Sequence, residues 1–246
     1  MNLYGLIGYP LSHSFSKKYF NDRFEKEGIE NCRYENFPLP SINELPALIQ
    51  SNSELKGINV TIPYKEAVIP FLTLKNEVVE ATGACNCIKI SGSKLEGFNT
   101  DVAGFERSLK KQLLPQHNKA LILGTGGAAK AVAYVLAKAE IEFLIVTRKA
   151  ENESIKHIRY EALTTDILYS HLLIINTTPL GMYPDTEKAP ELDYAKISSR
   201  HYLFDLTYNP DKTLFLRKGE ANGALIQNGY DMLIIQAEES WKLWNL

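Results

Sequence analysis

The chain has little of what secreted and membrane proteins usually carry. Its 246 residues include three cysteines, Cys32, Cys85 and Cys87, an odd number that is too small for a disulfide framework and fits a reducing compartment. No apolar run approaches the roughly 20 residues of a membrane span. The first ten residues lack the basic region and the long apolar stretch of a signal peptide. We therefore expect a cytoplasmic protein with no membrane partner.

An excess of positive charge is also missing. The chain has 27 lysines and arginines against 29 acidic residues, a net charge of -2, whereas nucleic-acid-binding domains are usually basic. Metal ligands are sparse as well, because no nearby His or Cys pair joins Cys85 and Cys87 to complete a metal site. With 45% hydrophobic and 23% charged residues, the composition is that of an ordinary globular protein. We expect a small-molecule partner, with no nucleic acid and no metal.

The most informative stretch is residues 119–149, which predicts a strand, a glycine turn, a helix and a second strand. The turn fits G-x-G-x-x-A, with Gly124, Gly126 and Ala129 at the small positions. In a βαβ unit the first glycine makes the tight turn, and the second lets the backbone approach a pyrophosphate. The N–H groups at the helix start then face the phosphates. The flanking strand and helix favour dinucleotide binding over a glycine turn without a ligand.

The end of the second strand indicates which dinucleotide is bound. An acid placed about 20 residues after the glycines commonly binds the ribose 2′-OH of NAD. This chain has Thr147-Arg148-Lys149 there, and a hydroxyl followed by two cations suits a 2′-phosphate. The alternative is a solvated strand end. The distance from the fingerprint favours NADP.

Polar residues also follow the strand predicted at residues 3–7. Ser14 and Ser16 stand at alternate positions of this loop and suit a carboxylate, which hydroxyls bind by charge-assisted hydrogen bonds. The alternative is that one serine caps the helix predicted at 17–27. We interpret the neighbouring His13 as a structural residue.

Alternation over residues 58–62 predicts a strand with Asn59 and Thr61 on its polar face. Pro63 is expected to end this strand and to begin a helix that contains Lys65. By itself Lys65 is most simply a surface charge. Asp101 is well placed to cap the helix predicted at 102–112.

Eight short motifs occur in the order in which shikimate dehydrogenases carry them, and the chain resembles that family along nearly its whole length. They are G-x-P-x-x-H-S-x-S at 8–16, N-V-T-x-P-x-K at 59–65, G-A-x-N at 83–86, N-T-D at 99–101, G-x-G-G-A at 124–128, N-x-T-P-L-G-M at 176–182, D-x-x-Y-N-P at 205–210 and G-x-x-M-L-x-x-Q-A at 229–237.

The resemblance implies an α/β fold of two domains. A substrate domain with a mainly parallel sheet would comprise residues 1–101 and 229–246, and a Rossmann-like, doubly wound NADP-binding domain would comprise residues 102–228. The implied reaction is the reversible, NADPH-dependent reduction of 3-dehydroshikimate to shikimate on the route to chorismate and aromatic amino acids. The expected assembly is a monomer or a homodimer.

The resemblance also implies a role for each matching residue. Lys65 and Asp101 would be the catalytic pair. Substrate would be bound by Ser14, Ser16, Asn59, Thr61, Asn86, Tyr208 and Gln236. Cofactor would be bound by Gly124, Thr125, Gly126, Gly127, Ala128, Thr147, Arg148, Lys149, Glu77, Thr177, Leu206 and Gly229.

Two alternatives compete with this interpretation. The first is a quinate/shikimate dehydrogenase that uses NAD or both cofactors, against which Thr147-Arg148-Lys149 argues. The second is a non-catalytic, nucleotide-sensing relative that regulates a partner. Such a protein should have lost the catalytic pair, yet Lys65 and Asp101 are both present.

Overall fold

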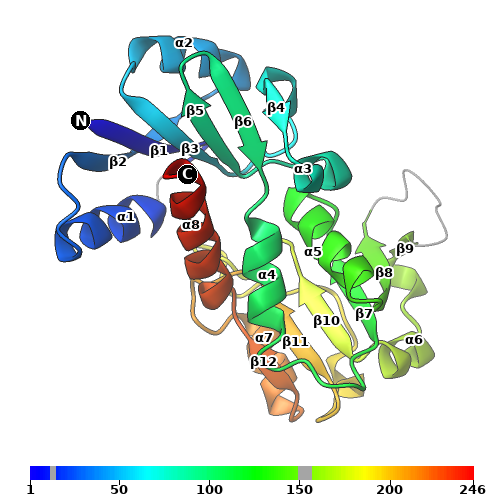
Figure 1. Cartoon of the computed structure of the whole chain (residues 1–246). Helices are drawn as coiled ribbons and strands as arrows, with labels where there is room; N and C mark the ends of the chain where they lie inside the picture. The colour runs from blue at the N-terminus through cyan, green and yellow to red at the C-terminus, as the bar shows by residue number, and fades with distance from the viewer. Residues whose placement is uncertain (12–14, 149–156) are drawn as a thin grey trace. The chain divides into compact units, whose positions relative to one another are not determined.

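The computed structural model describes residues 1–11, 15–148 and 157–246 and consists of two compact units (Figure 1). Unit 1 contains Met1–Thr100 and Ala237–Leu246, and unit 2 contains Asp101–Gln236. The second division falls inside helix α8 (Tyr230–Trp244), which contributes to both units. Both units are α/β, as predicted.

Unit 1 contains a mixed six-stranded sheet in the order β2-β1-β3-β5-β6-β4. Strand β1 is parallel to both of its neighbours, and β5 runs antiparallel to β3 and β6. Strands β5 and β6 form an antiparallel hairpin. The strands are β1 (Asn2–Gly8), β2 (Cys32–Pro38), β3 (Leu55–Val60), β4 (Leu74–Lys75), β5 (Cys87–Ser91) and β6 (Lys94–Phe98).

Apolar side chains cover both faces of this sheet. On one face the core includes residues of α2 (Leu45–Ser51) and α3 (Glu77–Thr82). On the other face, α1 (Phe15–Lys26) and the last turns of α8 pack an aromatic cluster. Gly57 makes room for that cluster, because a Cβ at this position would overlap the indole of Trp244. The indole N–H donates to the Ile88 carbonyl at 3.0 Å.

Unit 2 contains a six-stranded, fully parallel sheet in the order β12-β11-β10-β7-β8-β9. The chain order reverses between β7 and β10, which is the topological switch point where doubly wound folds bind ligands. Helices α6 and α7 pack on one face of this sheet. On the other face, the ring of Phe105 on α4 contacts the ring of Phe204 on β11. The strands are β7 (Lys119–Leu123), β8 (Glu142–Thr147), β9 (His157–Arg159), β10 (Leu173–Asn176), β11 (Tyr202–Asp205) and β12 (Leu225–Gln227); the helices are α4 (Asp101–Leu109), α5 (Gly127–Lys138), α6 (Thr165–Ser170) and α7 (Leu214–Ala221).

The helix predicted around Lys65 is wrong. Residues 62–68 form turns, followed by a short 3-10 helix at Ile69–Phe71. The Lys65 carbonyl accepts the Cys85 N–H at 2.7 Å. In an α-helix it would accept the Ile69 N–H, but that N–H donates to the Glu66 carbonyl at 3.2 Å. A tertiary contact thus takes the acceptor that an α-helix would use.

Within the described ranges, no helix reaches the length and hydropathy that a bilayer crossing requires.

Candidate active site

The glycine turn of unit 2 lies directly at the switch point. Gly124 follows β7 with φ of +112°, a conformation that favours glycine. A Cβ on Gly124 would lie 2.7 Å from the Thr177 hydroxyl oxygen, so the loops after β7 and β10 are in contact. Thr177 fixes this contact, because its N–H and its hydroxyl both donate to the Leu123 carbonyl, at 3.0 and 2.7 Å. The structure therefore brings together two of the predicted cofactor positions.

The start of α5 is open for an anion. Gly126 is the N-cap residue and supplies no side-chain cap, so the first N–H groups of α5 depend on an outside acceptor. A Cβ at Gly126 would meet no atom within 4 Å. An unobstructed backbone at the N-terminus of a twelve-residue helix suits a phosphate. Thr125, Gly127 and Ala128 belong to the same turn, and these residues fit the pyrophosphate of a dinucleotide.

Thr147 and Arg148 lie at the same edge of the sheet as this turn. Strand β8 pairs with β7 in parallel, with Val146 opposite Leu123, so both strands end together. Arg148 is exposed. Burial raises the pKa of Tyr160 to about 12, and the charge of Arg148 acts in the opposite direction. A guanidinium at this strand end suits a 2′-phosphate. Lys149 lies outside the described residues.

A buried carboxylate holds the next two strand ends together. Asp205, at the end of β11, accepts hydrogen bonds from the Asn176 amide at 3.1 Å, the Thr207 N–H at 3.0 Å and the Thr213 hydroxyl at 2.6 Å. Burial raises the pKa of Asp205 to about 6 and outweighs these three donors, which lower it. Asp205 thus orders the loop that contains Leu206 and Tyr208.

Asn176 also fixes the loop after β10 through hydrogen bonds. Its Oδ1 accepts the N–H and the hydroxyl of Thr178, at 3.0 and 2.6 Å. Sequence reasoning assigned no role to Asn176 or Asp205. The available signal was their place as polar residues directly at the ends of two buried apolar strands.

Two other predicted cofactor positions are also in contact. A Cβ on Gly229 would overlap the Leu206 carbonyl, and the Gly229 N–H donates to the Thr207 carbonyl at 3.1 Å. Only glycine permits this close approach of the segment before α8 to the end of β11.

Asp101 and Gln236 lie on two helices that touch within unit 2. A Cβ on Gly104 would be 2.7 Å from the Met232 carbonyl oxygen and 3.2 Å from Gln236 Cβ. Asp101 precedes Gly104 by three residues, so both lie on the same face of α4. Asp101 is 5% exposed and Gln236 is 9% exposed. The Gln236 amide donates to the Leu233 carbonyl at 2.9 Å.

In unit 1 the loops after β1 and β3 are joined. The Thr61 N–H donates to the Ile7 carbonyl at 2.9 Å, and the Tyr9 N–H donates to the Ile62 carbonyl at 3.1 Å. A Cβ on Gly8 would lie 2.5 Å from the Thr61 methyl group, so this methyl packs on the glycine. Lys65 follows in the same loop, half-buried, and its carbonyl bond to Cys85 places it beside the segment of Asn86.

A buried hydrogen-bond network links two of the predicted substrate residues, Asn59 and Asn86. The Asn59 amide nitrogen donates to the Asn86 carbonyl at 3.3 Å and to the Ser240 hydroxyl at 2.9 Å. Asn59 Oδ1 accepts the Tyr34 hydroxyl at 2.9 Å. Asn59, Asn86 and Tyr34 therefore belong to one connected set.

Thr100 also belongs to this network, through contacts with Asn86 and Ser240. Its N–H donates to Asn86 Oδ1 at 2.7 Å, and its hydroxyl lies 3.2 Å from the Ser240 hydroxyl. Sequence reasoning missed Thr100, Tyr34 and Ser240. Ser240 carried one signal, because it stands one helical turn after Gln236 on α8.

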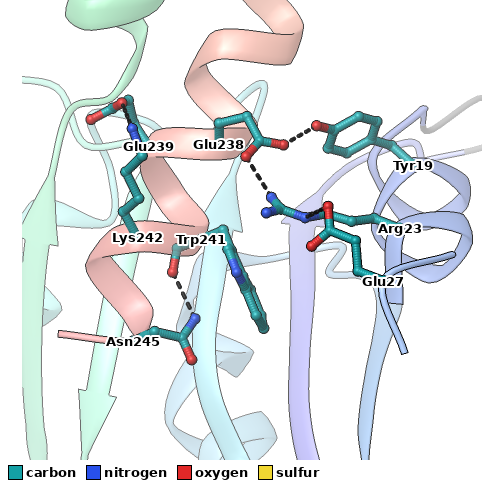
Figure 2. A network of polar contacts seen from close by, with 8 residues as sticks. All are labelled: Tyr19, Arg23, Glu27, Glu238, Glu239, Trp241, Lys242 and Asn245. Atoms are coloured by element: carbon teal, nitrogen blue, oxygen red, sulfur yellow. Dashed lines mark hydrogen bonds and ion pairs between the residues drawn. The ribbon is translucent and has the colours of Figure 1, made fainter. Parts of the chain in front are cut away.

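A second cluster fixes α1, the helix that carries Ser16, against the end of α8 (Figure 2). The Arg23 guanidinium donates to Glu238 at 2.6 Å and lies 5.6 Å from the centre of the Trp241 ring. The Tyr19 hydroxyl donates to the other oxygen of Glu238. Burial and the Glu238 carboxylate raise the pKa of Tyr19, so the phenol keeps the proton that it donates.

The predicted residues divide between the units. Ser14 lies outside the described residues. Unit 1 contains Ser16, Asn59, Thr61, Lys65, Asn86 and Glu77, the last being exposed at the start of α3; unit 2 contains Asp101, the half-buried Tyr208, Gln236 and the remaining cofactor positions that the structure describes.

Comparison with known proteins places the chain in a family. Residues 6–88 match the shikimate dehydrogenase substrate binding domain. The Shikimate dehydrogenase (NADP(+)) of Clostridium beijerinckii is 38% identical over 251 residues, which cover 99% of this chain and 92% of that protein.

Solved structures of shikimate dehydrogenases are also similar to this chain over nearly its whole length. The chorismate mutase/shikimate 5-dehydrogenase fusion protein from Clostridium acetobutylicum has a TM-score of 0.86 at 36% identity, covering 100% of this chain and 91% of that one. Shikimate 5-dehydrogenase from Thermus thermophilus, in complex with NADP(H) and shikimate, has a TM-score of 0.86 at 30% identity, covering 99% of this chain and 93% of that one. The chain therefore belongs to the shikimate dehydrogenase family.

Proposed function

We propose that the protein is an NADP-dependent shikimate dehydrogenase that reversibly reduces 3-dehydroshikimate to shikimate, on the route to chorismate and aromatic amino acids. The observation that carries this proposal is the open glycine turn at the switch point of unit 2, with Thr147 and Arg148 at the end of the neighbouring strand. The choice of substrate rests on relatives that carry this activity in their names over the full length of the chain.

We assign cofactor binding to residues 102–228 and substrate binding to residues 1–101 and 229–246. The backbone from Thr125 to Ala128 would hold the pyrophosphate, and Thr147, Arg148 and Lys149 would hold the 2′-phosphate. Bound NADPH would supply the hydride. The remaining cofactor positions are Gly124, Thr177, Leu206, Gly229 and Glu77.

Substrate binding is assigned to polar side chains of both units. The hydroxyls of Ser14 and Ser16 would donate to the carboxylate of shikimate. Its ring hydroxyls would be bound by Asn59, Thr61, Asn86, Tyr208 and Gln236, whose amide and hydroxyl groups can both donate and accept.

Lys65 and Asp101 are proposed as the catalytic pair. Negative charge develops on the ketone oxygen during reduction, and a nearby ammonium group stabilises this charge and delivers the proton. In the oxidation of shikimate, neutral Lys65 would accept the same proton. Asp101 would orient the Lys65 side chain for this proton transfer.

The direct test is the rate of NADP reduction by shikimate at alkaline pH, with NAD and quinate measured beside them. We expect the highest kcat/KM for shikimate with NADP. The Arg148→Gln variant should lose roughly tenfold or more with NADP, the value of one charged hydrogen bond, and little with NAD. Arg200→Gln is a matched control, because Arg200 is exposed just before β11, at the opposite edge of the sheet.

Turnover with quinate or NAD alone would replace the proposal by a quinate/shikimate dehydrogenase. Bound NADP without turnover of any of these substrates would indicate a nucleotide-binding protein without the activity.

A further inference from the structure

Ser240, in the second half of α8, is hydrogen-bonded to a residue to which we assign contact with substrate, yet no role has been given to it. Its side chain is fully buried. Its hydroxyl oxygen is 2.9 Å from the Asn59 amide nitrogen and 3.2 Å from the Thr100 hydroxyl oxygen. The Thr100 hydroxyl oxygen is in turn 3.0 Å from the Asn86 amide nitrogen. Two hydroxyls therefore connect the side chains of Asn59 and Asn86.

The orientation of the Asn59 amide follows from one fixed acceptor. The Asn86 backbone carbonyl can only accept, so the group of Asn59 that faces it is the NH₂. The same nitrogen donates to the Ser240 hydroxyl oxygen, and Asn59 Oδ1 accepts the Tyr34 hydroxyl. Both amide hydrogens of Asn59 are thus engaged. Ser240 provides the shorter of these two contacts, at 2.9 Å against 3.3 Å.

The orientation of the Asn86 amide follows from one fixed donor. The Thr100 N–H can only donate, so the atom of Asn86 that faces it, at 2.7 Å, is Oδ1. The Asn86 NH₂ then donates to the Thr100 hydroxyl oxygen. Each of the two hydroxyls therefore accepts one amide hydrogen, and the hydrogen bond between them joins α8 to Thr100.

We propose that Ser240 is a positioning residue for substrate. It would hold the Asn59 amide directly, and the Asn86 amide through Thr100, in the orientation that binds the substrate hydroxyls. This inference rests on the proposed function. The four side chains are at most 5% exposed, so bulk water does not replace a partner that one of them loses.

The effect on substrate binding follows from the cost of an unpaired buried group. Without the Ser240 hydroxyl, an N–H of Asn59 loses its acceptor, which is unfavourable. The Asn59 amide then rotates toward other acceptors, and only a fraction of the molecules presents it in the binding orientation. The apparent affinity for shikimate falls in proportion to that fraction. NADP affinity should not change, because the pyrophosphate is assigned to unit 2 and Ser240 belongs to unit 1.

A double-mutant cycle tests whether Ser240 acts through Asn59. We would measure kcat/KM for shikimate with NADP in the wild type, Ser240→Ala, Asn59→Ala and the double variant. Ser240→Ala should lower kcat/KM about fivefold, the value of one hydrogen bond, and mainly through KM. The loss in the double variant should be smaller than the product of the single losses by about twofold or more, the lower range of coupling within one network.

A second cycle tests the connection through Thr100. Thr100→Val removes the hydroxyl at nearly constant volume, and its loss of kcat/KM should likewise be smaller in an Asn86→Ala background. This cycle does not depend on how Ser240→Ala folds. Losses that multiply in both cycles would reduce the two hydroxyls to a structural role and overturn the inference.

Ser108→Ala is the matched control. Ser108 is another fully buried serine on a helix, and its hydroxyl accepts the Gln227 amide at 2.7 Å, but it belongs to unit 2. The variant should keep the wild-type kcat/KM for shikimate, and urea midpoints show whether each variant is folded. In an active wild type, an equal loss in Ser108→Ala and Ser240→Ala, or no loss in Ser240→Ala, would overturn the inference alone. A wild type that fails to oxidise shikimate would overturn the proposed function as well.

Discussion

The two units present polar groups at their strand ends by different means. In unit 2 the backbone dominates: Gly124 turns at φ of +112°, and Gly126 leaves the start of α5 uncovered. In unit 1 side chains dominate, since Asn59 alone bonds to Tyr34, Asn86 and Ser240. We infer that a ligand of constant structure, such as a dinucleotide, can be bound by a backbone cradle, which here is the glycine turn at residues 124–128. A small polar substrate needs several oriented side chains.

Loss of Lys65 should have the largest effect of any change in the side-chain unit. Lys65→Ala should lower kcat by about 10²- to 10⁴-fold, the range for removal of a general acid, because no other group is assigned to deliver the proton. NADP affinity should be unchanged, since the cradle lies in unit 2. Stopped-flow or steady-state rates with shikimate would measure kcat.

Lys56→Ala is the matched control for this change, because Lys56 is an exposed lysine on β3 of the same unit and should be dispensable. Equal losses from Lys56→Ala and Lys65→Ala would contradict the assignment.

The backbone cradle can be tested with two glycines two residues apart. Gly126→Ala should fold normally, because φ is -74° and the new methyl meets no atom within 4 Å. Its affinity for NADP should fall roughly tenfold or more if one phosphate hydrogen bond is lost. Gly124→Ala should also lose stability, since the methyl would approach the Thr177 hydroxyl at a strained φ. Thermal unfolding and NADP titration separate the effects; normal NADP affinity in Gly126→Ala would place the pyrophosphate elsewhere.

The buried carboxylate of unit 2 predicts a pH dependence of stability. The pKa of Asp205 rises from 3.8 to about 6 on folding, so between these values the native state binds more protons than the unfolded state. The contribution of Asp205 to the unfolding free energy therefore falls as pH rises from about 4 to 6, by about 2–3 kcal/mol. Asp205→Asn does not titrate, so the stability of the wild type relative to this variant should fall over that range. Urea midpoints at several pH values measure it, and a constant difference would show that the carboxylate does not titrate there.

The smallest expected effect is at the cluster that joins α1 to the end of α8. Glu238→Gln weakens bonds to Arg23 and Tyr19 (Figure 2) and should lower the unfolding free energy by about 0.5–1 kcal/mol, because the Arg23 pair is partly exposed. Glu27→Gln is the control, since Glu27 is more exposed and bonds only the Nε of Arg23 in this cluster. Equal urea midpoints for the two variants would mean that the cluster adds no stability.

Local patterns predicted the fold where a long periodic segment or a glycine turn defined it. The β7–α5–β8 unit follows from the sequence. Short elements such as α3 and β9 were not predicted, because six and three residues carry too little periodicity. The helix expected at Lys65 was wrong because a partner twenty residues away, Cys85, takes its carbonyl.

The residues of the candidate site likewise differ in whether local sequence patterns could predict them. The glycine turn is local, so its residues could be named from the sequence. The positions of Tyr34 and Ser240 in the network depend on Asn59, which lies 25 and 181 residues away along the chain. No spacing rule reaches over such separations. The roles of Lys65 and Asp101 came from family resemblance and remain predictions.

The central claim is that the backbone of unit 2 binds the pyrophosphate of the cofactor and that side chains of unit 1 contribute to shikimate binding. Calorimetric titration of NADP without substrate, combined with kcat/KM for shikimate, tests it on Gly126→Ala and Thr61→Val. We predict that Thr61→Val lowers kcat/KM for shikimate roughly tenfold, the value of one hydrogen bond, and leaves NADP affinity unchanged. Gly126→Ala should lose NADP affinity. An equal loss of NADP affinity in both variants, or a loss confined to Thr61→Val, would contradict this division.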